Sequence, residues 1–232
     1  MVFANTHGPL VFLLSLHPYE DTNSMPQPLR IKNILFDLGG VILDIDVQAT
    51  KQRFYELGLP ALFMQYPENM LTDLFFRYET GKINTTQYRD EVRRISGLEV
   101  PDHDIDEAWC AMLVGIPAER VELISRLKER YRLYMLSNTC ELHVPVFENM
   151  FQKVSGNSMH EIFDGIYYSF EIGQHKPDAE AWEHVIRDAR IKPEETLFLD
   201  DNIHNIKASQ ELGFQAIHIH ERTSLMNLGF DL

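Results

Sequence analysis

Short apolar runs recur along the chain from residue 30 onward, and most of them end at a polar residue. Five runs of this kind cover residues 31–36, 133–136, 166–169, 197–199 and 215–219. Segments between them carry apolar residues three or four positions apart. After Pro117, for example, Val121, Ile124 and Leu127 share one helix face. Strands that alternate with amphipathic helices predict an α/β protein, with a Rossmann-like parallel sheet covered by helices on both faces.

One interval is too long for a single strand–helix–strand unit. About 100 residues separate Asp37 from Ser137, whereas such a unit needs about 30. Helical spacing is found over 48–57, 68–78, 85–96 and 105–114, with glycine or proline turns between them. We therefore predict a four-helix cap without strands at residues 46–116. It would be inserted into a core of residues 29–45 and 117–232, and residues 1–28 would form an N-terminal extension.

Composition and charge narrow the class of partner. The chain has 232 residues, 44% of them apolar, which is enough for a sizeable core. A net charge of −14 argues against a general nucleic-acid binder but permits a small anionic substrate when a cation is bound. Cys110 and Cys140 are too far apart in the sequence to form a metal-binding motif such as Cys-x-x-Cys. We therefore predict that both are free thiols in a reducing compartment. We expect a cytoplasmic protein without nucleic-acid or membrane partners; the sequence leaves its oligomeric state open.

Polar side chains with complementary chemistry follow the predicted strands. Asp37 ends the first run, Ser137 the second and the pair Asp200-Asp201 the fourth, while Lys176 follows the third. In a parallel sheet these positions share one edge, where ligands bind. Three carboxylates there repel one another unless a cation lies among them, and oxygen ligands suit Mg²⁺. The hydroxyl and the ammonium suit phosphoryl oxygens, and an aspartate can attack phosphorus.

Four segments, in this order, resemble the motifs of the haloacid dehalogenase-like hydrolases. They cover residues 34–44, 136–139, 176–178 and 198–205, the last with Gly213, and the resemblance spans about residues 30–220. The predicted insert lies where that family places a helical cap, between the first two motifs. Within the family the chain is most similar to the subgroup that contains bacterial α-D-glucose-1-phosphate phosphatases. The similarity includes Glu79-x-Gly81-x-Ile83 in the cap and His143 after the second motif.

The resemblance implies a metal site at the end of the first and fourth motifs. Asp37 would be both the nucleophile and a ligand of Mg²⁺. Gly39 would offer its backbone carbonyl to the metal. Asp201 would be a direct ligand, and Asp200 beside it would be a second ligand or would hold a metal-bound water.

The resemblance also implies a phosphate site and a reaction. Ser137 and Lys176 would hold the transferring phosphoryl oxygens, and the Asn138 amide would contact the substrate or its phosphate. Gly40, next to Gly39, would let the backbone turn tightly and approach the phosphate. The implied reaction is Mg²⁺-dependent hydrolysis of a small phosphorylated metabolite, a sugar phosphate, through an aspartyl-phosphate intermediate.

One position departs from the phosphatases of the family. They carry a second aspartate two residues after the nucleophile, and here that residue is Gly39. If the backbone of Gly39 has a positive φ, a side chain introduced there would be strained. General acid–base catalysis is worth about 10²–10⁴-fold. Another group, such as Asp44, Asp46, His175 or a cap residue, would replace it, or the leaving group would be an easy one, as in an anomeric phosphate. Otherwise the chain hydrolyses C–halogen or C–P bonds, or binds a phosphorylated metabolite without catalysis.

One helix face of the predicted cap has two interpretations. Arg77, Tyr78, Glu79 and Lys82 lie either on a solvated surface or against the substrate. If the cap selects substrates, substitution of Arg77, Glu79 or Lys82 is predicted to change the preference among sugar phosphates.

Overall fold

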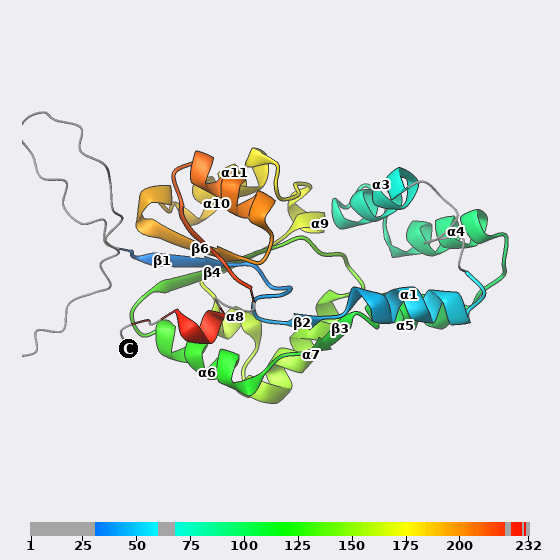
Figure 1. Cartoon of the computed structure of the whole chain (residues 1–232), viewed down its shortest axis with the longest axis horizontal. Helices are drawn as coiled ribbons and strands as arrows, with labels where there is room; N and C mark the ends of the chain where they lie inside the picture. Colours follow the sequence, from blue (N-terminus) through cyan, green and yellow to red (C-terminus); the bar gives the residue numbers. More distant parts are fainter. Residues whose placement is uncertain (1–30, 60–67, 221–223, 229, 231–232) are drawn as a thin grey trace, which may run out of the picture.

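The computed structural model describes residues 31–59, 68–220, 224–228 and 230, so the predicted extension at residues 1–28 lies outside it. None of the helices in these residues is both long and apolar enough to cross a membrane. Figure 1 shows the arrangement of the elements. In chain order these are β1 (Asn33–Phe36), β2 (Asp44–Ile45), α1 (Val47–Glu56), α3 (Glu68–Glu79), α4 (Thr85–Ser96), α5 (Asp102–Cys110), β3 (Leu113–Gly115), α6 (Ala118–Leu127), β4 (Arg132–Ser137), α7 (Val144–Ser155), α8 (Met159–Ile162), β5 (Gly165–Tyr168), α9 (Ser169–Ile172), α10 (Ala179–Ala189), β6 (Thr196–Asp200), α11 (Ile203–Glu211) and β7 (Gln215–His218), with short 3₁₀ turns at Pro193–Glu195 and Leu225–Asn227.

The described strands form a five-stranded parallel sheet in the order β5-β4-β1-β6-β7. The predicted α/β fold is confirmed. In the centre, Phe36 of β1 is level with Met135 of β4 and Leu199 of β6. The three central strands therefore end at the same edge, and the polar residues that follow them are brought together there.

Both faces of the sheet are covered by helices, as Figure 1 shows, with α10 and α11 on one side and α6, α7 and α8 on the other. Side chains of β1 alternate between the faces because successive residues of a strand point in opposite directions. Ile34 and Phe36 pack in one apolar cluster with α6 and α7. Leu35 packs on the other face with Trp182 of α10 and Ile206 of α11. This two-sided burial explains why the strands read as nearly continuous apolar runs.

Helices α1, α3, α4 and α5 lie together beyond one end of the sheet (Figure 1). They enclose an apolar cluster of their own, which includes Phe54, Tyr88 and Trp109. Three predicted helical segments correspond to α1, α3 and α4. The boundaries of the cap at residues 46 and 116 stay a prediction.

The fourth helix predicted over 105–114 is present as α5, but its predicted end at residue 114 and the prediction that the insert has no strand are wrong. Helix α5 ends at Cys110, and Leu113–Gly115 form β3, which pairs antiparallel with β2. Two contacts from distant residues hold the chain extended there. The Met112 carbonyl accepts a hydrogen bond from Asp46 N (2.9 Å), and Met112 N donates to the Thr50 hydroxyl (3.0 Å).

Candidate active site

The polar residues that follow the strands converge on one cavity at the carboxyl edge of the sheet. Asp37 comes directly after β1, Ser137 ends β4 and Asp200 ends β6. The cavity has a volume of about 320 Å³. Seven of the eight predicted site residues line it: Asp37, Gly39, Gly40, Ser137, Asn138, Lys176 and Asp201. The eighth, Asp200, is completely buried behind them and contacts Lys176.

Lys176 is a buried cation fixed between two carboxylates. Its Nζ lies 2.8 Å from Asp37 Oδ1 and 2.7 Å from Asp200 Oδ2, and only 1% of its side chain is exposed. Burial acts to lower the pKa of Lys176, but the two carboxylates outweigh it and raise that pKa above its ordinary value. The ammonium is therefore held in place and charged beside the predicted nucleophile.

One lysine does not neutralise the acidic cluster. Carboxylate oxygens of Asp37, Asp200 and Asp201 lie within 4.8 Å of one another. Burial, reinforced by the neighbouring carboxylates and only partly offset by Lys176, raises the pKa of Asp37 to about 7. Burial and Asp200 likewise raise the pKa of Asp201. An all-oxygen cluster with excess negative charge fits Mg²⁺, which prefers oxygen ligands.

Gly40 brings the backbone against this cluster. Its φ is +70°, a conformation that favours glycine, and an added Cβ would lie 2.1 Å from Asp201 Oδ2. A side chain at residue 40 would therefore displace the Asp201 carboxylate.

Asn205, the last residue of the fourth motif at 198–205, positions Asp200. Its Nδ2 donates to both Asp200 oxygens at 3.0 Å, and Asn202 N donates to Asp200 Oδ1 at 2.8 Å. Asn205 Oδ1 is buried, and no described residue is its hydrogen-bond partner. The spacing of five residues from a strand-terminal aspartate into the next helix is the sequence signal for this role.

The place of the missing aspartate is taken by an apolar side chain. An added Cβ at Gly39 would lie 2.5 Å from the terminal methyl group of Ile45. The expected positive φ at Gly39 is wrong, because among this pair the left-handed residue is Gly40. The obstacle to a side chain at residue 39 is therefore Ile45 and not backbone strain.

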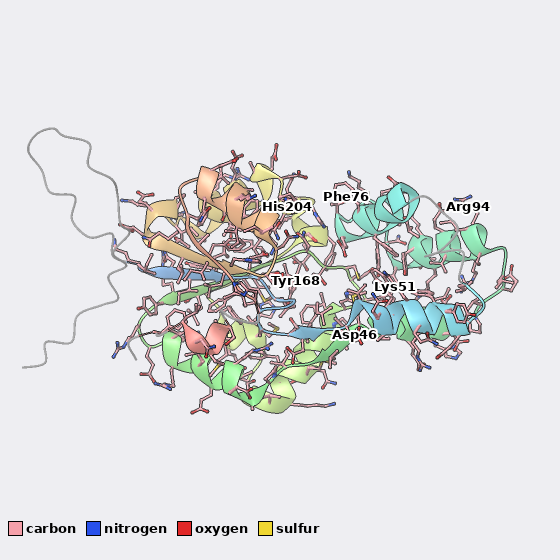
Figure 2. The ribbon with its side chains drawn as sticks, viewed as in Figure 1. Asp46, Lys51, Phe76, Arg94, Tyr168 and His204 are labelled. Carbon is pink, nitrogen blue, oxygen red and sulfur yellow. The ribbon has the colours of Figure 1, made fainter. Side chains whose placement is uncertain are left out.

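The structure does not bring two of the suggested replacement acids to the cavity. Asp44 forms an ion pair with Arg120 at 2.8 Å. Asp46 caps α1 by accepting a hydrogen bond from Gln48 N at 2.9 Å, and Figure 2 shows it at the start of that helix. Neither residue lines the cavity.

Of the four cap residues considered above, Glu79, the last residue of α3, lines the cavity. Arg77 pairs with Asp73, and the Lys82 ammonium lies over the Phe76 ring, 4.6 Å from its centroid. Tyr78 is buried in the cluster of the helical insert. Of these four residues, only Glu79 is therefore in a position to contact a ligand in the cavity.

His143, which follows the second motif, also lines the cavity. Its ring stacks on Trp109, with centroids 5.3 Å apart, and burial lowers its pKa to about 4. The imidazole is therefore neutral at neutral pH. The apolar part of the wall is formed by Leu38, Leu43, Ile45, Val47, Met112, Leu113 and Phe147, and the polar side chains of Thr139, Asn202 and Asn205 also line the cavity.

Comparison with known proteins decides the family. The sequence profile of the haloacid dehalogenase-like hydrolases matches residues 31–213. The chain belongs to this family. It is also similar to the D-ribitol-5-phosphate phosphatase of Bacteroides thetaiotaomicron, with 32% identity over 190 residues that cover 80% of this chain and 90% of that protein.

Solved structures of this hydrolase family agree. An enzyme of the family from Bacteroides thetaiotaomicron is 34% identical, with a TM-score of 0.80 over 82% of this chain and 94% of that one. Its wild-type complex with magnesium and inorganic phosphate is 35% identical, with a TM-score of 0.75 and the same coverage. A predicted hydrolase of the family from Porphyromonas gingivalis is 32% identical, with a TM-score of 0.74 over 81% and 90% of the two chains. The predicted family and hydrolytic class are confirmed, and the finer subgroup stays a prediction.

Proposed function

We propose that this hydrolase is a Mg²⁺-dependent phosphatase of a small phosphorylated metabolite, with sugar or polyol phosphates as its substrate class and Asp37 as its nucleophile. The observation that carries the proposal is the buried Asp37 carboxylate, which lies between a fixed ammonium and further carboxylates at a cavity of metabolite size. The similarity to a D-ribitol-5-phosphate phosphatase and to a magnesium and phosphate complex supports it.

The residues that would hold Mg²⁺ are Asp37, Asp200, Asp201 and the carbonyl of Gly39. When bound, the ion supplies positive charge that keeps the carboxylates ionised and attracts the phosphate oxygens. Asp37 must be ionised to attack, and its pKa of about 7 in the protein alone makes that ionisation depend on added positive charge.

Asp37 then forms a bond from its carboxylate oxygen to phosphorus, and the ester P–O bond breaks. The leaving oxygen takes a proton from solvent water and departs as an alcohol, and the attack of water in the next step returns a proton to solvent. Water attacks the aspartyl-phosphate at phosphorus, which releases inorganic phosphate and restores Asp37. Lys176 Nζ lies 2.8 Å from Asp37 Oδ1, and in the proposed reaction it would donate to the phosphoryl oxygens throughout.

Ser137 and Asn138 complete the predicted phosphate site, and Asn138 also shapes the Lys176 loop. Asn138 Oδ1 accepts a hydrogen bond from Lys176 N at 2.9 Å, and its Nδ2 donates to Lys176 O at 2.8 Å. Because both backbone groups of Lys176 are engaged, the loop holds the ammonium in one place.

The test is phosphate release from p-nitrophenyl phosphate and from a panel of sugar and polyol phosphates, with Mg²⁺ and with excess EDTA. We expect chelation to abolish turnover and Mg²⁺ to restore it. Asp37→Asn should lower kcat by about 10³-fold or more, since the amide is nearly the same shape but a poor nucleophile. Asp73→Asn makes the same change on the exposed side of α3 and is the matched control.

Two outcomes would contradict the proposal. Undiminished phosphate release in excess EDTA would contradict the dependence on Mg²⁺ and leave a phosphatase that needs no metal. Binding of Mg²⁺ and phosphate without turnover of any ester would favour a non-catalytic protein that binds phosphorylated metabolites.

A further inference from the structure

Helix α3 ends at a carboxylate that reaches the cavity. Among the described residues that the helical insert contributes to the lining, Glu79 is the one with a titratable side chain. About a quarter of that side chain is exposed. Its Oε2 lies 3.0 Å from Nε2 of His175, the residue that precedes Lys176. Glu79 therefore connects the insert to the loop that carries the predicted phosphate ligand.

Hydrogen bonds fix which ring nitrogen of His175 carries the hydrogen. The Asn138 amide is oriented by Lys176, whose N donates to Asn138 Oδ1 at 2.9 Å. Asn138 Nδ2, 3.1 Å from His175 Nδ1, must then be the donor in that contact. His175 Nδ1 accepts, so Nε2 bears the hydrogen and donates it to Glu79. This chain of contacts holds Glu79 as a hydrogen-bond acceptor.

The backbone after Glu79 is packed closely on the core. Gly81 has a φ of +66°, and an added Cβ would lie 2.2 Å from the Phe170 carbonyl oxygen. Four residues later, Thr85 N and the Thr85 hydroxyl both donate to Glu141, which follows the second motif. Because the segment is anchored at both points, the position of Glu79 is set by the backbone as well as by His175.

Glu79 lines the cavity from the helical insert, which lies beyond the edge of the sheet that carries Asp37 (Figure 1). In phosphoryl transfer the attacking and leaving oxygens are roughly in line, so a group displaced by Asp37 points away from the sheet edge and toward the insert. There it meets the Glu79 carboxylate and, on another part of the wall, the apolar side chains of Ile45, Val47 and Met112. An acceptor beside an apolar surface suits a molecule with hydroxyl donors and C–H faces.

We propose that Glu79 selects leaving groups that donate hydroxyl hydrogens and carry no negative charge, so that neutral sugar or polyol monophosphates are preferred over monophosphates with a second anionic group. His175 is the positioning residue for Glu79. The proposal rests on the proposed phosphatase function. A hydroxyl gains a charge-assisted hydrogen bond from the carboxylate, whereas a second anion is repelled by it.

The experiment compares two substrates with the same six-carbon chain, glucitol 6-phosphate and 6-phosphogluconate, which differ by a terminal hydroxymethyl group or carboxylate. The readout is the ratio of their kcat/KM values in saturating Mg²⁺, because a general loss of activity cancels in a ratio. We expect the wild type to favour glucitol 6-phosphate. Glu79→Gln should lower the ratio by about tenfold or more, since hydrogen bonds to charged groups contribute at this scale.

Two further variants sharpen the test. Glu79→Lys should raise kcat/KM for 6-phosphogluconate above the wild-type value, a gain that damage to the fold cannot produce. Glu56→Gln, an exposed substitution on α1 away from the cavity, should leave the ratio unchanged. His175→Gln should shift the ratio in the same direction as Glu79→Gln.

The outcomes separate this proposal from the one on which it rests. If the wild type hydrolyses p-nitrophenyl phosphate but shows no preference between the two six-carbon substrates, selection by Glu79 is refuted and the phosphatase stands. The same conclusion follows if Glu79→Gln keeps the wild-type ratio and Glu79→Lys gains nothing on 6-phosphogluconate. If the wild type hydrolyses no phosphate ester in Mg²⁺, the phosphatase proposal itself is refuted.

Discussion

Asp37 is predicted to destabilise the metal-free protein as pH rises. Its pKa is about 7 in the folded protein and 3.8 ordinarily, because burial and the neighbouring carboxylates outweigh Lys176. Between these values the unfolded chain has lost the proton that the folded protein keeps, so the free energy of unfolding falls with rising pH. At 1.36 kcal/mol for each pH unit between the two pKa values, the loss is about 4 kcal/mol.

His143 acts in the opposite direction over nearly the same range. Burial lowers its pKa from 6.5 to about 4, so the unfolded chain binds a proton there that the folded protein does not. Stability therefore rises between about pH 4 and pH 6.5, by about 3 kcal/mol on the same conversion. Lys176 does not intervene, because its raised pKa affects stability only above its ordinary value of 10.5. The two effects oppose each other, and the raised pKa of Asp201 adds to the effect of Asp37, so the wild-type profile alone does not isolate Asp37.

The difference between the wild type and Asp37→Asn isolates the effect of Asp37. Urea denaturation followed by circular dichroism in excess EDTA gives the free energy of unfolding of each protein from about pH 4 to pH 7. Because the amide does not titrate, the variant should gain about 4 kcal/mol relative to the wild type across this range. Saturating Mg²⁺ should reverse the order near pH 7 by stabilising the wild type. A difference that stays constant with pH in EDTA would refute the reasoning.

Two predictions concern the adjacent glycines. Gly39→Asp should fold, since Ile45 is 41% exposed and can rotate away; an added acid should raise kcat/KM for alkyl phosphates toward that for aryl phosphates, within about 10²–10⁴-fold. If log kcat/KM of the wild type does not change with the pKa of the leaving group, another residue supplies the proton and the expected gain in Gly39→Asp is contradicted. Gly40→Ala should weaken Mg²⁺ binding in calorimetry by about tenfold or more, because the new methyl group displaces Asp201, one of the proposed charged ligands. Gly97→Ala, at a φ of +69° with open space around it, should bind Mg²⁺ like the wild type; equal affinities for both variants would contradict the role of Gly40.

The sheet and the residues at its edge could be predicted because the signal is local. A strand buried on both faces must be apolar at successive positions, as Ile34, Leu35 and Phe36 are, and the first polar residue after it marks the edge. Parallel pairing then places residues from distant parts of the chain together without further information. Asp37, Ser137 and Asp200 are neighbours for this reason.

The end of α5 could not be predicted because its signal is not local. Ile105, Trp109 and Met112 continue the helical spacing past Cys110, so periodicity alone extends the helix to residue 114. What ends it is the pairing of β3 with β2, together with the Thr50 hydroxyl that accepts from Met112 N. Strands of two and three residues leave no periodicity of their own to detect.

The short β2 strand matters for chemistry as well as for topology. It places Ile45 against Gly39, so the surroundings of the position two residues after Asp37, the proposed nucleophile, are apolar. Where other phosphatases of the family have a second aspartate, this chain has Gly39. The carboxylate that reaches the cavity from the helical insert is Glu79, which accepts a hydrogen bond from His175. An acceptor binds a hydroxyl well but does not protonate a departing oxygen. The two features together favour substrates whose leaving group carries hydroxyls for Glu79 and departs with little help, which are properties that an anomeric sugar phosphate combines.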